Sequence, residues 1–223
     1  MAPHHHLRAT GSTNDVAREL AAAGAVHGTV VTAQEQTAGR GRQGRAWVAP
    51  AGSSLLASIV VRPFGPLLPL AGAVAVARAC GEAAQIKWPN DVLLGGGKVA
   101  GLLTEANVAG GWAVLGVGVN VALDLEGLPE DVRARAATLG RRPEDVPGVL
   151  ADLLAALDAA LRLDDDVLLE RWRARDALVG RPVRWERGEG VAQGVDAAGH
   201  LLVARPDGAV EALSAGEVHL GMT

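Results

Sequence analysis

Apolar and polar residues alternate in short blocks along this chain of 223 residues, and the blocks predict a mixed α/β fold. Residues 11–24, "GSTNDVARELAAAG", predict a helix that Ser12 caps together with Asp15 and that ends at Gly24. Residues 28–36 and 53–63 predict strands, and residues 68–84 predict a buried helix. Because helices and strands interleave and a hairpin follows, we expect a mixed sheet covered by helices.

The middle of the chain is organised around glycine turns. Residues 86–106, "IKWPNDVLLGGGKVAGLLTEA", predict a turn, a strand, a glycine turn and a returning strand. Residues 111–123 are apolar at successive positions, which predicts a central strand covered on both faces. The polar residues 125–140 predict a loop or a short helix, and residues 146–163 and 164–176 predict two further helices.

The pattern changes at about Leu178. From there the chain holds short β segments separated by "RGEG", "DAAGH" and "RPDGA", a spacing that is typical of a small β-barrel. We therefore predict two domains, the first formed by residues 1–177 and the second by residues 178–223.

The composition restricts the class of protein. Apolar residues make up 49% of the chain, enough to bury a core. The sequence contains no run of about 18 apolar residues, so no membrane-spanning helix is predicted. The net charge is −4, whereas a DNA-binding protein usually carries a basic face. The single cysteine, Cys80, lies in an apolar helical pattern, where a buried small side chain is expected. We expect a cytoplasmic protein that binds neither DNA nor a membrane. Residues 4–6, "HHH", are interpreted as a tag remnant or a native tail rather than a metal site.

The two lysines stand out against 19 arginines, because Lys87 and Lys98 both fall within "KWPNDVLLGGGK". This clustering suggests that a compact ammonium group is needed there, with chance as the alternative. Asn90 and Asp91 lie between the lysines. They are interpreted either as an Asx turn or as ligand groups, with Asn90 facing phosphate and Asp91 helping to hold Mg²⁺.

Residues 37–50, "TAGRGRQGRAWVAP", contain the spacing G-x-G-x-x-G that is found in dinucleotide-binding folds. Such a fold needs a helix directly after the glycines, and the proline and glycines that follow predict none. Arg40, Arg42 and Arg45 share this segment with no acidic residue. The segment is therefore predicted to close over an anionic ligand, with Trp47 covering the ligand or stacking on a base. A solvated surface loop is the alternative.

The sequence "GVGVNV" at residues 116–121 interrupts an otherwise apolar strand. Gly116 and Gly118 weaken the strand, which predicts that a ligand or another part of the backbone comes close. Asn120 is then interpreted either as a group facing the ligand or as a satisfied amide at the end of a buried strand.

Taken together, these motifs resemble the biotin protein ligase family in their order and spacing: "GSTN", Gln36 before "AGRGRQGRAW", "KWPNDVLL…GGKVAGLLTE" and "GVGVNV". The resemblance runs from about Gly11 to the C-terminus and implies an α/β catalytic domain followed by a small SH3-like β-barrel. It implies that biotin and ATP are joined to give biotinyl-5′-AMP. Biotin then passes to a lysine of a biotin carboxyl carrier protein or of a carboxylase domain. Since "STN" begins at position 12, we expect the short form without an N-terminal DNA-binding domain.

The resemblance also implies roles for individual residues. Lys98 and Arg42 are implied to be catalytic, with Mg²⁺ accompanying ATP, Asp91 as a candidate metal ligand, and a homodimer through the sheet. The biotin site is implied for Ser12, Thr13, Asn14, Gln36, Arg40, Gly41, Arg42, Lys98, Gly101 and Gly116. The nucleotide site is implied for Arg42, Arg45, Trp47, Lys87, Asn90, Lys98 and Asn120.

Three alternatives stay open at the level of the sequence. The first is a lipoate–protein ligase or an octanoyl transferase of the same superfamily, against which "GRGRQGRAW" favours biotin. The second is a module that binds biotin or a nucleotide without catalysis, against which the presence of Lys98 within intact motifs favours an enzyme. The third, a structural α/β protein with a β-barrel tail, leaves the clustered lysines and the arginine loop unexplained.

Overall fold

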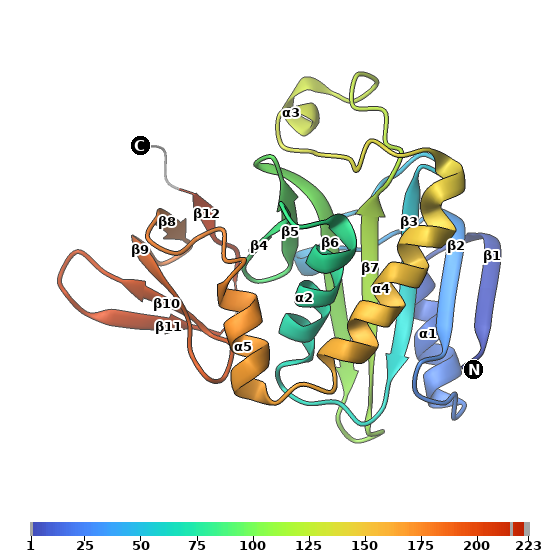
Figure 1. Cartoon of the computed structure of the whole chain (residues 1–223), viewed down its shortest axis with the longest axis horizontal. Coiled ribbons are helices and arrows are strands. Elements are labelled where there is room, and N and C mark those ends of the chain that lie inside the picture. The colour runs from blue at the N-terminus through green and yellow to red at the C-terminus, as the bar shows by residue number, and fades with distance from the viewer. Residues whose placement is uncertain (1, 215, 221–223) are drawn as a thin grey trace.

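The structure is a computed structural model that describes residues 2–214 and 216–220. It contains a seven-stranded mixed sheet of order β1-β2-β3-β7-β6-β5-β4 and a five-stranded antiparallel sheet of order β11-β10-β9-β8-β12. Figure 1 shows the two sheets side by side, with helices packed against the larger one. The predicted α/β class, with a mixed sheet and a small C-terminal β domain, is confirmed.

The large sheet is antiparallel from β2 to β4, and β1 joins it in parallel with β2. Its strands are β1 (His4–Thr10), β2 (Val30–Gln36), β3 (Ser54–Val61), β4 (Gln85–Lys87), β5 (Asp91–Leu94), β6 (Gly97–Asn107) and β7 (Trp112–Asn120). The small sheet is formed by β8 (Pro182–Trp185), β9 (Gly188–Val195), β10 (Leu201–Ala204), β11 (Val210–Leu213) and β12 (His219–Leu220). The α-helices are α1 (Thr13–Ala22), α2 (Leu68–Cys80), α3 (Glu130–Arg133), α4 (Val146–Ala160) and α5 (Asp165–Arg173), and the 3₁₀ turns are η1 (Arg42–Gly44) and η2 (Pro143–Asp145).

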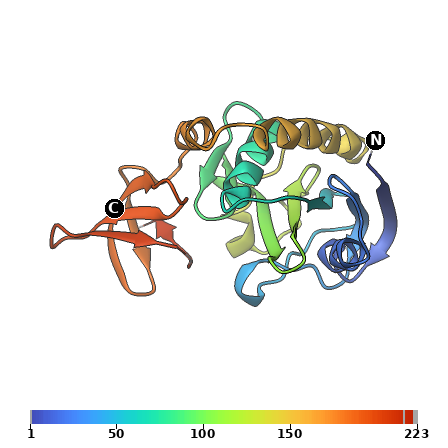
Figure 2. The same cartoon turned by 90° about the horizontal axis from the view of Figure 1, so that it is seen from below.

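Strands β3 and β7 form the centre of the large sheet, and they are apolar on both faces because helices cover each face. On one face, α1 packs with Val31, Val60 and Val114. On the other face, α2 and α4 cover Ile59 and Leu115. Figure 2 shows these helices above and below the sheet. The central strand predicted within residues 111–123 is therefore confirmed, and its burial fixes the floor of the cleft described below.

Strand β1 is not evident from the apolar pattern, and the interpretation of residues 4–6 as a tail is wrong. These residues pair with β2, and the rings of His4 and His6 lie 2.8 and 2.9 Å from the same Thr32 hydroxyl oxygen. An edge strand of this kind is defined by its backbone hydrogen bonds to the neighbouring strand and needs few apolar side chains. Tertiary pairing therefore decides this element.

Helix α1 begins directly after Ser12, whose backbone is extended as expected for an N-cap residue. The Ser12 side chain makes no capping hydrogen bond, so the predicted capping arrangement with Asp15 is wrong in this respect. The Asp15 carboxylate instead accepts two hydrogen bonds of 2.6 Å from the guanidinium of Arg40 in the glycine loop. A long-range ion pair has taken the place of the local interaction.

Helix α2 ends at Cys80 rather than near residue 84. Gly81 has φ +114°, outside the helical region, and terminates the helix. The helix packs against the sheet, α4 and α5, which accounts for its nearly uniform apolar composition. Cys80 is buried in this packing, and burial raises the pKa of its thiol to about 12. The predicted buried small side chain is confirmed.

The small sheet is tied to the large one at strand β4 and the residues that follow it. Ile86 N donates to Arg175 O at 2.7 Å, which attaches the edge of β4 to the segment after α5. The buried indole of Trp88 donates to Gly199 O, at the turn between β9 and β10, at 3.1 Å. Within the residues described, no helix is long and apolar enough to cross a membrane.

Candidate active site

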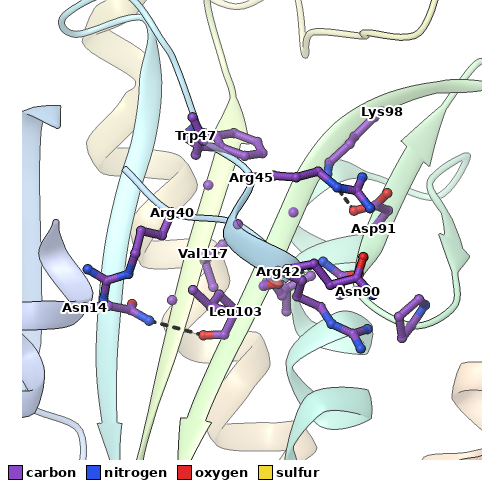
Figure 3. A pocket seen from close by; sticks show the side chains of 18 of the residues that line it. Asn14, Arg40, Arg42, Arg45, Trp47, Asn90, Asp91, Lys98, Leu103 and Val117 are labelled. Carbon is purple, nitrogen blue, oxygen red and sulfur yellow. Dashed lines mark hydrogen bonds and ion pairs between the residues drawn. The ribbon is translucent and has the colours of Figure 1, made fainter. Parts of the chain in front are cut away.

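A cleft lies beneath the loop of residues 37–50, over strands β6 and β7. It brings together the four sequence motifs, which are separate along the chain, and Figure 3 shows the side chains converging on it. Residues singled out from the sequence that line it are Ser12, Thr13, Asn14, Gln36, Arg40, Gly41, Arg42, Arg45, Trp47, Lys87, Asn90, Asp91, Lys98, Gly101, Gly116 and Gly118.

The glycine loop folds back on itself as a short hairpin. Gly41 N donates to Arg45 O at 2.7 Å, and Trp47 N donates to Gly39 O at 2.9 Å. Gln43 and Gly44 have φ of 56° and 74°, in the left-handed region that lets the chain reverse. Only a short 3₁₀ turn lies within the loop, and strand β3 follows it. The dinucleotide-binding arrangement, which needs a helix at this point, is therefore excluded.

Trp47 leaves this hairpin and lies on two glycines of the sheet floor. Gly101 and Gly118 face each other across β6 and β7, and a Cβ atom at Gly118 would lie 2.5 Å from the Trp47 ring. A Cβ atom at Gly101 would lie 3.0 Å from the same ring. The glycines therefore allow a close approach, which the sequence predicted for Gly118 but not for Gly101, and here the approaching group is an indole.

Lys98 stands at the start of β6 beside this indole. Its Nζ lies 2.6 Å from Asp91 Oδ1 and 5.6 Å from the centroid of the Trp47 ring (Figure 3). The side chain is 36% exposed, so the ammonium group is accessible from the cleft. A cation held by one carboxylate and one aromatic face can exchange the carboxylate for an anionic ligand.

The opposite end of the cleft is a neutral hydrogen-bonding niche. Thr13 donates from both its backbone N and its hydroxyl to Gln36 Oε1, at 2.8 and 2.9 Å. The hydroxyl of Ser58 lies 2.8 Å from Thr13 Oγ1 and 2.6 Å from Asn14 Oδ1. A Cβ atom at Gly116 would overlap Asn14 Oδ1, so this glycine makes room for the amide. Such an array suits a small polar ring system without charge.

The three loop arginines differ in their partners. Arg40 is bound by Asp15, and Arg45 forms an ion pair with Glu217. Arg42 is the one loop arginine that forms no ion pair with an acid of the described residues. Burial lowers the pKa of its guanidinium, although an arginine remains a cation at neutral pH. An uncompensated cation in the lining of a cleft favours an anionic ligand.

The C-terminal sheet also reaches the cleft. Gly216, Glu217 and Val218, which precede β12, are part of its lining, and Lys87 lies in the same region. Burial lowers the pKa of Lys87 below its usual value, against the opposing influence of Asp91 and Glu217. No local signal marks Glu217 in the sequence, because only the packing of the two sheets brings it to the glycine loop.

Asn120 is the one candidate that does not line the cleft as described. Its side chain is buried, and its Nδ2 donates to Ala137 O at 2.9 Å and to Lys98 O at 3.4 Å. These bonds tie the segment after α3 to β6. The arrangement corresponds to the satisfied amide at a strand end, the alternative weighed for this residue.

Besides Glu217, two residues beside the cleft were missed from the sequence. Ser58 is fully buried in β3 and reaches the lining only through Thr13 and Asn14, and Glu105 of β6 accepts from Asn14 Nδ2 at 2.7 Å. A signal existed for Ser58, which is a polar residue within the apolar strand "SLLASIVV". Glu105 belongs to the quoted segment "GLLTE", but its partners are apparent only in three dimensions.

A metal ion would find few protein ligands here. In the described part of the chain, no group of three or more His, Cys, Asp or Glu side chains could hold a metal ion. Asp91 and Glu217 are the carboxylates in the cleft lining, and each has a basic partner. A divalent cation at this site would therefore depend largely on oxygen ligands from a bound substrate and water.

Comparison with known proteins places this geometry in a family. The model of the "Biotin/lipoate A/B protein ligase family" matches residues 7–121, and that of the "Biotin protein ligase C terminal domain" matches residues 178–221. A biotin–[acetyl-CoA-carboxylase] ligase of Paracoccus denitrificans is 37% identical and covers 96% of this chain and 99% of its own length. The chain belongs to the biotin protein ligase family.

Two further biotin protein ligases agree with this assignment. A biotin–[acetyl-CoA-carboxylase] ligase of Mycobacterium tuberculosis is 37% identical over 94% of this chain and 85% of its own length. The structure of a biotin protein ligase from Aquifex aeolicus in complex with biotin and ATP has a TM-score of 0.83 and 26% identity, and the match covers 100% of both chains. The cleft of this biotin protein ligase therefore has a neutral hydrogen-bonding niche at one end and the ammonium group of Lys98 at the other.

Proposed function

We propose that this protein is an ATP-dependent biotin protein ligase that modifies a biotin carboxyl carrier protein or domain. The main support for this proposal is that the two ends of the cleft differ in charge. A neutral niche around Thr13 and Gln36 lies at one end. Lys98 lies at the other end together with Arg42, which pairs with no acid among the described residues. Biotin has a neutral ureido ring and a carboxylate, and ATP supplies the phosphates, so both substrates fit this polarity.

In the first step the biotin carboxylate attacks the α-phosphorus of ATP. A C–O–P linkage forms, the bond to the β-phosphate oxygen breaks, and pyrophosphate leaves. Two anionic groups must approach each other, so neutralisation of charge and positioning lower the barrier. We assign Lys98 to the carboxylate and the α-phosphate, and Arg42 to phosphate oxygens. The nucleotide side would further use Arg45, Trp47, Lys87 and Asn90. To reach the substrates, Lys98 exchanges its contact with Asp91 for the incoming anions.

Mg²⁺ is included in this proposal as the companion of ATP. The residues present fit a Mg²⁺ site in which Asp91 would supply one carboxylate oxygen. The other ligands would come from the phosphates of ATP and from water. When bound, the ion would neutralise charge on the departing pyrophosphate. The protein's own contribution at this end is the pair Lys98 and Arg42, which hold the phosphate and carboxylate oxygens in place.

The glycine loop is assigned the role of a lid. An acyl-adenylate reacts readily with water, so the intermediate must be shielded until the carrier arrives. The Trp47 indole already covers Gly101 and Gly118, and Arg42 projects from the turn above the cleft. In the second step the neutral amine of a carrier lysine attacks the acyl carbon. A C–N bond forms, AMP leaves, and the amine proton passes to the solution.

We further propose that the chain is organised in two domains. Residues 1–177 form the catalytic domain, and residues 178–223 form a C-terminal domain that contributes Glu217 to the cleft. We place the protein in the cytoplasm without a role in DNA binding. Strand β1 lies at the edge of the large sheet, and none of the described strands pairs with its outer side. We propose this edge as the surface at which a second copy of the chain or the carrier protein docks. A gel-shift assay and a sedimentation experiment test the DNA and dimer statements.

The test is the release of pyrophosphate from Mg-ATP with biotin, lipoate and octanoate supplied separately. Release that depends on biotin, followed by transfer to a carrier domain, is the expected result. Release with lipoate or octanoate alone would assign the protein to the sister activities of the superfamily. The absence of release with every acid would favour a binding module without catalysis.

A further inference from the structure

Arg40, the first arginine of the glycine loop, is held by acids outside the loop. Its Nη1 and Nη2 donate to the two carboxylate oxygens of Asp15 in α1, each at 2.6 Å. Its Nη2 also lies 3.5 Å from Glu105 Oε2 in β6. A bidentate pair between a guanidinium and a carboxylate fixes orientation as well as distance, unlike a single surface ion pair.

Glu105 connects this pair to the neutral end of the cleft. The same Oε2 that faces Arg40 accepts a hydrogen bond of 2.7 Å from Asn14 Nδ2. Asn14 Oδ1 in turn accepts from the fully buried Ser58. A continuous chain of polar contacts therefore runs from the sheet core to the base of the loop.

The loop is divided by the directions of its arginines. Figure 3 shows Arg40 pointing toward Asn14, whereas Arg45 forms an ion pair with Glu217 in the segment before β12. Gln43 and Gly44, whose φ angles lie in the left-handed region, fall between the two ends. The hydrogen bond from Arg40 also lowers the pKa of Asp15, because the guanidinium stabilises the ionised carboxylate. The first arginine is thus committed to the protein.

We infer that Asp15 and Glu105 are positioning residues that anchor Arg40, so that lid motion is confined to the part of the loop after Arg40. The link to catalysis rests on the function proposed above: a fixed first turn would keep the loop in register over biotin while Arg42, which forms no ion pair among the described residues, moves. Loss of the anchor would release the whole loop. Binding of biotin would then have to order it again, which weakens apparent affinity for biotin more than it slows the chemical step.

The experiment compares full-length Asp15→Asn and Glu105→Gln with Arg18→Gln. Arg18 Nη1 lies 3.4 Å from Glu105 Oε1 and 3.8 Å from Asp15 Oδ1, but no contact joins Arg18 to the loop in the described part of the chain. Arg18→Gln is therefore a matched control, because it removes a charge beside the same two carboxylates. Asp15→Glu retains the carboxylate and serves as the conservative rescue. Two measurements are made: trypsin cleavage after Arg42 and Arg45 without ligand, with fragments identified by mass, and the biotin dependence of pyrophosphate release.

The anchor predicts cleavage about tenfold faster in Asp15→Asn and Glu105→Gln, with Arg18→Gln at the wild-type rate. It also predicts a KM for biotin about tenfold higher, kcat within about twofold, and values close to wild type for Asp15→Glu. Equal cleavage in all variants that keep their circular dichroism would overturn the inference. Cleavage does not depend on catalysis, so it decides about the anchor even if the wild-type protein releases no pyrophosphate with biotin, a result that would refute only the proposed function.

Discussion

Ser58 donates a hydrogen bond of 2.6 Å to Asn14 Oδ1, although Ser58 itself is fully buried and lies behind the cleft wall. An amide oxygen can only accept, so the single hydroxyl proton is committed to this bond. The other side of the same amide donates to Glu105, and these two contacts fix the orientation of the Asn14 side chain. The niche is therefore held from behind by a residue that does not face the ligand.

Ser58→Ala should raise the KM for biotin about tenfold and leave the KM for ATP unchanged, because Asn14 Oδ1 loses its buried donor. The measurement is pyrophosphate release with each substrate varied in turn. Ser54→Ala is the matched control. Ser54 lies on the same strand and is also buried, but its hydroxyl has no hydrogen-bond partner among the described residues. Equal effects of the two variants on the KM for biotin would remove Ser58 from its assigned role.

Lys98→Arg should keep the fold and slow adenylation by about 100-fold, the usual cost of losing one well-placed donor. The guanidinium is wider than the ammonium, and the space beside Lys98 is limited by Trp47, so the two anions can no longer share one point charge. Single-turnover formation of biotinyl-5′-AMP measures the step directly. A rate near that of the wild type, with the melting temperature unchanged, would exclude Lys98 from the mechanism.

Arg42→Ala should release or hydrolyse the adenylate faster, on the order of tenfold or more, because the lid loses its uncommitted cation. The half-life of enzyme-bound biotinyl-5′-AMP after removal of free substrates gives this quantity. Gln43→Asn is a suitable control, since asparagine tolerates the left-handed φ of 56° at this position and the change removes no charge. An unchanged half-life would show that the loop does not retain the intermediate through Arg42.

Asp176 provides a prediction about stability and pH. It lies between α5 and the small sheet, its Oδ1 accepts from Leu178 N at 2.8 Å, and its buried Oδ2 has no partner in the described part of the chain. Burial raises the pKa of this carboxyl above its ordinary value of 3.8. The folded state therefore binds the proton more tightly than the unfolded state, and the protein loses stability as pH rises from 3.8 through the folded-state pKa.

Asp176→Asn should accordingly raise the melting temperature at pH 7, because the amide carries no charge and its oxygen can still accept from Leu178. Near pH 3 the gain should vanish, since the wild-type carboxyl is protonated in both states. Thermal unfolding across this pH range checks the sign. A gain of equal size at both pH values would assign the effect to packing rather than to ionisation.

Most residues of the candidate site could be predicted from the sequence. Lys98, Asp91, the arginine loop and the glycines of "GVGVNV" could be singled out because reactive groups and backbone room are properties of residue type and local spacing. The same holds for β3 and β7, whose continuous apolar runs predict strands covered on both faces. The resemblance to biotin protein ligases rested on these local features and was confirmed.

The partners of those residues were decided by the tertiary structure. Asp15 was expected to support the start of its own helix and instead binds Arg40, while Asn120 serves the protein's own carbonyl groups. Strand β1 and the contribution of Glu217 to the cleft depend on contacts between segments far apart in the chain. The physical reason for this difference is that residue type and local spacing determine which groups a side chain is able to bind. Which of several competing donors and acceptors it does bind depends on distance and burial, which exist only after the chain has packed.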